Sequence, residues 1–168
     1  MTVLSLLRYP DPRLKMRCLD VTEFDHDLRR FSEDLLHAMR AAPGVGITAA
    51  HVGVLKRLVI IELEKADAVR IYANPKIIWA APETGRHMEG SVCMPGATEE
   101  VERPLRIRFR YQDLKGGIHE EDADGFLAVC IQHEIDQLDG VFWLQRLSRL
   151  KRERLIRKWE KNDPPSKV

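Results

Sequence analysis

Residues Gln132-His133-Glu134-Ile135-Asp136-Gln137 form the most informative segment of this 168-residue chain. They end an apolar stretch that predicts a largely buried helix over residues 125 to 138. In a His-Glu-x-x-His helix, two histidines one turn apart hold a metal ion, and the glutamate between them handles protons. Here His133 and Glu134 are present, but Gln137 stands at the position of the second histidine. A neutral amide oxygen is a much poorer ligand than imidazole for zinc or ferrous iron.

Taken alone, this segment favours a plainer interpretation. His-Glu pairs are common on helices, and a histidine in a buried helix is more often a hydrogen-bonded core residue than a metal ligand. The segment therefore indicates a functional site only if other parts of the chain supply matching groups.

Two further segments supply them: Gly44-Val-Gly-Ile-Thr-Ala-Ala-His51-Val-Gly53 and Glu89-Gly-Ser-Val-Cys-Met-Pro-Gly96. Together with residues 132 to 137, in this order and at these separations, they resemble the three signature motifs of the peptide deformylases. The resemblance implies an α+β fold in which mostly antiparallel strands surround a central motif helix. It runs essentially from end to end and also covers Tyr9-Pro-Asp-Pro-Arg13, Asn74-Pro75, Leu138-Asp-Gly-Val141 and the basic terminal helix.

The resemblance also implies a metal site. Family members remove the formyl group from the N-terminal formylmethionine of new polypeptides, using a divalent metal (Fe, Zn or Ni) held by one Cys and two His. The cysteine position is occupied by Ser91, and the histidine positions by His133 and Gln137. Because two of the three ligands are substituted, we expect the metal to be weakly bound or absent.

Other family roles carry over with two changes. The catalytic glutamate, which takes a proton from the attacking water and returns it to the leaving amine, matches Glu134. The substrate and oxyanion positions fall on Gly46, on the backbone N–H of Val92, and on His51, which replaces a glutamine. The usual alanine of the first motif is Thr48.

A replacement set of ligands is also conceivable. Ser91 and Cys93 are two residues apart, so in an extended segment their side chains share one face. A two-residue slip would bring Cys93 to the old ligand position, where His51 and His133 could complete a Cys-His-His set. The plainer interpretation, which we favour, is that Cys93 is a small buried side chain and His51 a hydrogen-bonded one, because strand register is fixed by every neighbouring pair.

Two further residues near the motif receive structural interpretations. Asp136 is expected to form an ion pair with Arg103, matching a contact that orients the motif helix in the family. Cys130, one turn before His133 and Glu134, is expected to pack in the core.

Outside the motifs, the pattern of apolar residues predicts several regular elements. An amphipathic helix is expected over residues 25 to 42, with Asp25 as its N-cap, and a terminal helix over residues 149 to 161 after Ser148. Asp124 and Gly140 are expected to open and close the motif helix. Short strands are expected at Leu58-Val-Ile-Ile-Glu-Leu63, Val69-Arg-Ile-Tyr72 and Leu105-Arg-Ile-Arg-Phe-Arg-Tyr111, the last half exposed.

Composition and charge set the remaining expectations. The chain is 44% hydrophobic and 32% charged, which is typical of one globular domain over residues 1 to 168. Three widely spaced cysteines and no long apolar run favour a cytoplasmic protein without membrane contact. Residues 146 to 168 hold nine Lys or Arg against three acids, a charge of +6, whereas the whole chain is +1. In bacterial members of the family the corresponding helix contacts the ribosome, which makes the ribosome an expected partner beside the N-terminal peptides of nascent chains.

Two functional hypotheses follow. In the first, the protein is a hydrolase of the family with weak or altered deformylase activity. In the second, which we favour, it no longer catalyses and binds peptide N-termini or the ribosome. A drifting relative without a surviving role remains the plain alternative to both.

Overall fold

The computed structural model describes residues 2–64 and 68–162 as an α+β protein, which confirms the predicted fold class. Every pairing between its named strands is antiparallel. The helices are α1 (His26–Ala41), α2 (Gly125–Leu138) and α3 (Arg149–Asn162), with short 3-10 segments η1 (Pro12–Lys15), η2 (Ala49–Val52) and η3 (Trp143–Arg146). The strands are β1 (Gly46–Thr48), β2 (Leu58–Ile61), β3 (Arg70–Ala80), β4 (Thr84–Ser91), β5 (Met94–Pro104), β6 (Arg106–Gln112) and β7 (Ile118–Asp124).

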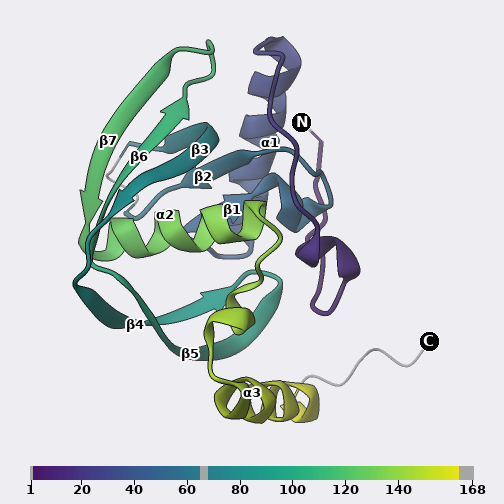
Figure 1. Ribbon diagram of the computed structural model, residues 1–168. Coiled ribbons are helices and arrows are strands. Elements are labelled where there is room, and N and C mark those ends of the chain that lie inside the picture. The colour runs from purple at the N-terminus through teal and green to yellow at the C-terminus, as the bar shows by residue number, and fades with distance from the viewer. Residues whose placement is uncertain (1, 65–67, 163–168) are drawn as a thin grey trace.

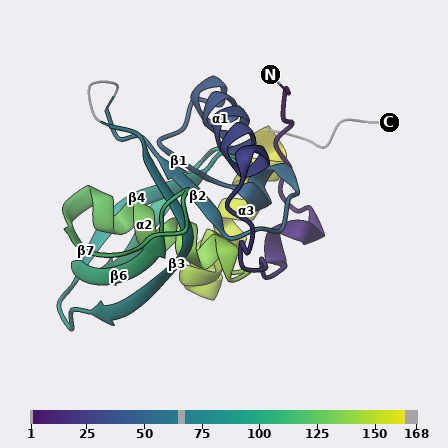
Figure 2. The same ribbon diagram turned by 90° about the horizontal axis from the view of Figure 1, so that it is seen from above.

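The motif helix α2 lies between two sheets (Figure 1). On one side is a five-stranded sheet in the order β1-β2-β3-β6-β7, and on the other is the β4–β5 hairpin. Helix α1 packs beside β1 and β2, whereas α3 lies beyond the hairpin, against β5 (Figures 1 and 2). Two structural layers therefore enclose the helix that carries the motif.

Helix α2 is buried along most of its length because both layers cover it. Every residue from position 128 to position 138 is buried. Ile131, Ile135 and Leu138 pack into a core with Ile107 and Phe109 of β6. Removing such side chains from water contributes about 1.5–3 kcal/mol each to folding. The same burial obliges the polar residues of the motif to find hydrogen-bond partners inside the protein.

The other two helices were also predicted correctly. Asp25 caps α1, because its carboxylate accepts a hydrogen bond from the N–H of Leu28 at 3.0 Å. Ser148 accepts one from Lys151 at 3.3 Å at the start of α3, which packs through Leu155 and Trp159 against the hairpin. Over residues 2–64 and 68–162, no helix combines the length and apolar character needed to cross a bilayer.

Four details differ from the expectations. Strand β3 begins one residue later than expected and runs on to Ala80, eight residues past Tyr72. The segment from Ser91 to Cys93 is not extended: it enters a tight turn in which Ser91 pairs with Met94, so the condition for a slipped Cys93 ligand is not met. Asp124 occupies the N-cap position of α2 without a side-chain capping bond in the described structure. The strands β1, β4, β5 and β7 were not predicted.

Candidate functional site

A cavity of about 430 Å³ lies where α2 meets β1 and the β4–β5 turn. Most of the residues singled out from the sequence border it, which places the three motifs around one space. The lining includes Gly46, His51, Ser91, Val92, Cys130, His133 and Glu134, with Met88, Met94, Phe126 and Val129 among its apolar members. Cys130 both packs in the core, as predicted, and borders this cavity.

Glu134 is held deep in the cavity wall by its contact with β1. A Cβ added to Gly46 would lie 2.8 Å from Glu134 Oε1, so the glycine provides the space for the carboxyl group. The other oxygen, Oε2, is buried and has no hydrogen-bond partner among the described residues. Burial raises the pKa of Glu134 to about 7. The group can therefore exchange a proton near neutral pH, as a general acid or base must.

We expect Gly46→Ala to destabilise the fold by about 1–3 kcal/mol, because the added methyl group overpacks against Glu134. Urea denaturation of Gly46→Ala and Glu134→Ala, singly and together, measures the effect as a double-mutant cycle. The penalty should shrink in the Glu134→Ala background. An equal penalty in both backgrounds would show that the glycine serves the β1 backbone rather than Glu134.

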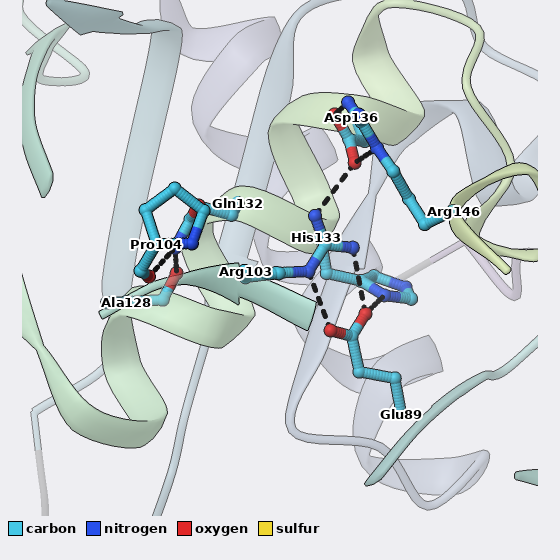
Figure 3. Close-up of polar contacts among 8 residues, drawn as sticks. All are labelled: Glu89, Arg103, Pro104, Ala128, Gln132, His133, Asp136 and Arg146. Carbon is cyan, nitrogen blue, oxygen red and sulfur yellow. Dashed lines mark hydrogen bonds and ion pairs between the residues drawn. The ribbon is translucent and has the colours of Figure 1, made fainter. Parts of the chain in front are cut away.

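His133 is anchored to a buried network of charges (Figure 3). Its Nδ1 lies 2.8 Å from Glu89 Oε1, and Glu89 accepts two further hydrogen bonds from the guanidinium of Arg103, at 2.6 and 2.9 Å. The predicted ion pair is confirmed: Arg103 Nη1 donates to Asp136 Oδ2 at 2.9 Å. Arg146 of η3 completes the network with two hydrogen bonds to Asp136. The imidazole is thereby fixed, and its Nε2 is the nitrogen left for a ligand.

The network sets the charge of its members. Burial alone would raise the pKa of Glu89, but hydrogen bonds from His133 and Arg103 overcome it and lower the pKa to about 2. Burial opposes charge on His133 as well, yet its hydrogen bond to Glu89 raises its pKa. Glu89 is therefore a stable carboxylate beneath His133.

We expect this carboxylate to make the fold sensitive to acid. A pKa lowered from 4.5 to about 2 stabilises the folded state above pH 4.5, and the stabilisation is lost as the pH falls from about 4.5 to about 2. The loss should approach roughly 3 kcal/mol. Urea unfolding at a series of pH values should show this slope in the natural protein and a shallower one in Glu89→Gln. Identical slopes would assign the acid sensitivity to other carboxyl groups.

The two substituted ligand positions are used for internal hydrogen bonds. Gln137 is buried, and its Nε2 donates to the carbonyl of Leu14 in η1 at 2.7 Å. Ser91 borders the cavity, and its Oγ accepts the N–H of Cys93 at 3.1 Å. Gln137 therefore links α2 to the N-terminal segment.

Cys93 and His51, the possible replacement ligands, also have other partners. Cys93 is 1% exposed, its Sγ lies 3.8 Å from the carbonyl of His51, and burial raises the pKa of its thiol to about 12. His51 Nδ1 accepts the N–H of Thr48 at 2.9 Å and lies 3.0 Å from Thr48 Oγ1. Burial lowers the pKa of His51 to about 3, so the 4.0 Å approach of Nδ1 to Glu134 is not an ion pair.

These donors do not fit the metal site that the resemblance implies. Of the three family positions, only His133 offers a strong ligand, since Ser91 presents an alcohol and Gln137 directs its amide to Leu14. Within residues 2–64 and 68–162, no three His, Cys, Asp or Glu side chains gather where they could hold a metal ion.

Sequence reasoning missed part of this arrangement. Glu89 and Arg146 were not singled out, although Glu89 opens the second motif. The Thr48 contact was missed too, although Thr48 and His51 are both departures from the family pattern and are three residues apart. Two substitutions three residues apart in one motif indicate that the two side chains contact each other.

Comparison with known proteins identifies the family. The model for the polypeptide deformylase family matches residues 3–153. A protein of Brucella melitensis named peptide deformylase-like is 60% identical, over 96% of this chain and 98% of its own length. A peptide deformylase of Phenylobacterium zucineum is 42% identical over 96% and 98%. The crystal structure of a peptide deformylase from Synechococcus elongatus, in complex with actinonin, has a TM-score of 0.89 at 34% identity and covers 92% of this chain and 86% of that one. The chain belongs to the polypeptide deformylase family.

Proposed function

We propose that this protein has little or no metal-dependent deformylase activity and that its cavity binds the N-terminal ends of polypeptides. The observation that carries the proposal is the orientation of Gln137, whose amide is bonded to the carbonyl of Leu14 and does not border the cavity. The residue at a family ligand position thus has a structural partner of its own.

The chemistry of the donors supports loss of the metal. Even residues that only orient a ligand change metal affinity by about 10 to 100-fold, so losing two ligands costs considerably more. His133 alone does not make a tetrahedral or five-coordinate site. An alcohol such as Ser91 does not readily replace a thiolate, because its high pKa keeps it protonated.

The cavity supports a binding role. Its volume of about 430 Å³ lies within the range of small-ligand sites, and it combines apolar side chains with a few convergent polar groups. The names of the relatives differ with their similarity to this chain. Proteins of Brucella melitensis and Agrobacterium fabrum, 60% and 55% identical, are named peptide deformylase-like. Relatives that are 42% and 40% identical are named peptide deformylase.

The test combines metal analysis with binding and turnover. Protein purified without oxygen or chelator is expected to carry well under one equivalent of iron, zinc or nickel. Calorimetry should detect binding of formyl-Met-Ala-Ser, and a formate assay should show little or no hydrolysis. Stoichiometric metal held through positions 91, 133 and 137, with turnover that Glu134→Ala abolishes, would establish the first hypothesis instead. Failure to bind any peptide would remove the binding role.

A second proposal concerns the ribosome, which would place the protein in the cytoplasm. Helix α3 packs through Leu155 and Trp159, and this leaves a basic face exposed on its outer side. Such a face attracts the phosphates of RNA, with an affinity that falls as salt rises. The exposed basic residues include Lys151, Arg154, Arg157, Lys158 and Lys161.

Co-sedimentation with ribosomes tests this role. Replacing Arg154, Arg157 and Lys161 by Glu should abolish co-sedimentation at moderate salt. The same number of reversals at the exposed residues Arg29, Arg30 and Lys76, which lie on other elements, is the matched control. Equal loss in both variants would indicate a general charge effect, without a specific role for α3.

A further inference from the structure

A second hollow, of about 520 Å³, lies on the exposed face of the five-stranded sheet. Side chains of β6 alternate between core and solvent, and Arg106 and Arg108 are on the solvent side. The strand register places Trp79 of β3 and Asp122 of β7 on either side of Arg108, and Asp124 of β7 opposite Arg106. None of the residues that line this hollow lines the motif cavity, so the two are separate.

Trp79 offers an aromatic surface that the protein leaves largely open. It is 48% exposed, whereas Trp143 and Trp159 are only 2% and 8% exposed. The guanidinium carbon of Arg106 lies 5.8 Å from the ring centroid of Trp79. This distance is near the outer limit of about 6 Å for a cation–π contact, so a flat ligand can still approach the indole. Exposed aromatic rings of this kind serve as stacking platforms for bases.

Two polar groups of the hollow have unused hydrogen-bonding capacity. Asp124 occupies the N-cap position of α2, but within residues 2–64 and 68–162 its carboxylate makes no capping bond and no ion pair. The side chain of Arg106 approaches Glu83 Oε2 at 3.7 Å, which is too long for a hydrogen bond. By contrast, Arg108 and Asp122 satisfy each other with hydrogen bonds of 2.7 and 3.2 Å. The hollow therefore presents a flat ring, an open acceptor group and an open fork of donors.

We propose that this hollow binds a guanine base, carried either by a nucleoside or by single-stranded RNA. A nucleobase is flat and uncharged, which suits a lining whose two arginines are balanced by Asp122 and Asp124. Guanine has two adjacent donors, N1–H and N2–H, and both can donate to the carboxylate of Asp124. On the neighbouring edge its O6 and N7 accept from Arg106, in the bidentate contact that arginine makes with guanine. Stacking on Trp79 supplies the remaining contact.

Other ligands satisfy only part of this arrangement. Hypoxanthine, the base of inosine, lacks the N2 amino group, and adenine has no N1–H, so each leaves the carboxylate of Asp124 with fewer donors. A phosphate group alone would lie beside the carboxylates of Asp122 and Asp124 and gain nothing from Trp79. A site that hydrogen-bonds a donor of its ligand discriminates against an analogue without that donor.

Calorimetry with guanosine, inosine and adenosine tests the choice of base, and the indole N–H signal of Trp79 in a proton–nitrogen NMR spectrum locates the site. Guanosine should shift that signal saturably. It should bind about tenfold more tightly than inosine or adenosine, because each of them lacks a donor to the carboxylate. Equal affinities for guanosine and inosine, or a shift confined to residues of the motif cavity, would overturn the proposal.

Two variants test the residues of the hollow. Trp79→Ala should weaken guanosine binding about tenfold through the loss of stacking. Asp124→Asn keeps a residue that suits a helix N-cap, and it should weaken guanosine more than inosine, so that the preference between them shrinks. An unchanged preference in Asp124→Asn would overturn the role of this carboxylate. Glu23→Gln removes an exposed carboxylate outside the hollow and is the matched control, which should leave both affinities unchanged.

Two oligonucleotides distinguish a free nucleoside from RNA. A short single-stranded oligouridine is compared with the same oligomer that carries one central guanosine. If RNA supplies the base, the guanosine oligomer should bind more tightly than guanosine itself; if a nucleoside does, it should bind less tightly. Equal binding of the two oligomers, with a strong dependence on salt, would overturn the proposal, because phosphate contacts alone would then account for binding.

Discussion

Replacing Ser91 by Cys and Gln137 by His is expected to give the protein a stoichiometric divalent metal. His133 is already held by Glu89 on the buried helix, so one ligand and its orienting contact are in place. The cysteine would enter at the mouth of the β4–β5 turn, beside the cavity that His133 also borders. Two added ligands should raise metal affinity by several orders of magnitude, since supporting contacts alone change it about 10 to 100-fold.

Hydrolysis of a formyl-methionyl peptide should follow metal binding, because Glu134 is present beside the site. The rate should remain modest while His51 stands in place of the glutamine that stabilises the oxyanion in the family. Removing one such donor typically costs about 10² to 10³ in rate. Adding His51→Gln should therefore raise the rate further, and the triple variant should be the most active.

The comparison that decides is the triple variant against the natural protein under identical metal loading, with formate release as the measurement. The variant with Gln137→His alone is the matched control, because it loses the hydrogen bond to Leu14 without completing the site. That loss should cost about 1–3 kcal/mol of stability. A triple variant that binds metal without hydrolysis would show that the cleft has diverged. A natural protein that already matches it would show that its own side chains hold a working metal.

The helices and their limits could be predicted from the sequence because their apolar spacing and caps are local. The carboxylate of Asp25 caps the helix that begins at the next residue, and the predicted motif helix has the bounds Gly125–Leu138. The family motifs then gave the arrangement around that helix, which apolar spacing alone does not contain.

The missed strands are those whose stability depends on their neighbours. Strand β7 reads Ile-His-Glu-Glu-Asp-Ala-Asp and has little intrinsic preference for a strand. It pairs with β6 along its whole length, and its acids face the basic side chains of that strand: Arg108 pairs with Asp122 at 2.7 Å, and Arg110 with Glu120 at 2.6 Å. Such cross-strand pairs become visible only when the register is known.

The sequence predicted which residues belong to the site, but not which partners those residues contact. The motifs brought His133, Glu134 and His51 to one cavity, and the pairing of Arg103 with Asp136 is confirmed. The direction of a side chain depends on partners that are distant in the sequence. Gln137 turns to a carbonyl 123 residues away, and no pattern within the motif indicates this.

Replacing Arg103 by Met is expected to destabilise the fold by about 3–5 kcal/mol, because it leaves two buried carboxylates without their shared cation. The guanidinium is 5% exposed and contacts Glu89 from β4 and Asp136 from α2. Burial opposes its charge, but the hydrogen bonds to Glu89 raise its pKa, so it is a permanent cation. Its loss therefore removes the ion pair that joins β5 of the hairpin to the motif helix.

Two further variants show where the stabilisation lies. Asp136→Asn should cost less, about 1–3 kcal/mol, because Arg103 keeps both hydrogen bonds to Glu89. Arg108→Ala removes an exposed ion pair on β6 and should cost less than about 1 kcal/mol.

Chemical denaturation measures the free energy of unfolding of all three variants. The order of the three losses tests whether Arg103 joins the two elements. If Arg103 joins two elements, its replacement must cost more than that of Asp136, since only the first change leaves both carboxylates short of a partner. Equal losses of stability in Arg103→Met and Asp136→Asn would mean that the contact between Arg103 and Glu89 contributes nothing to stability. His133 would then be oriented without Arg103. The nitrogen-15 signals of His133 should then be the same in the natural protein and in Arg103→Met, whereas the network predicts that they shift.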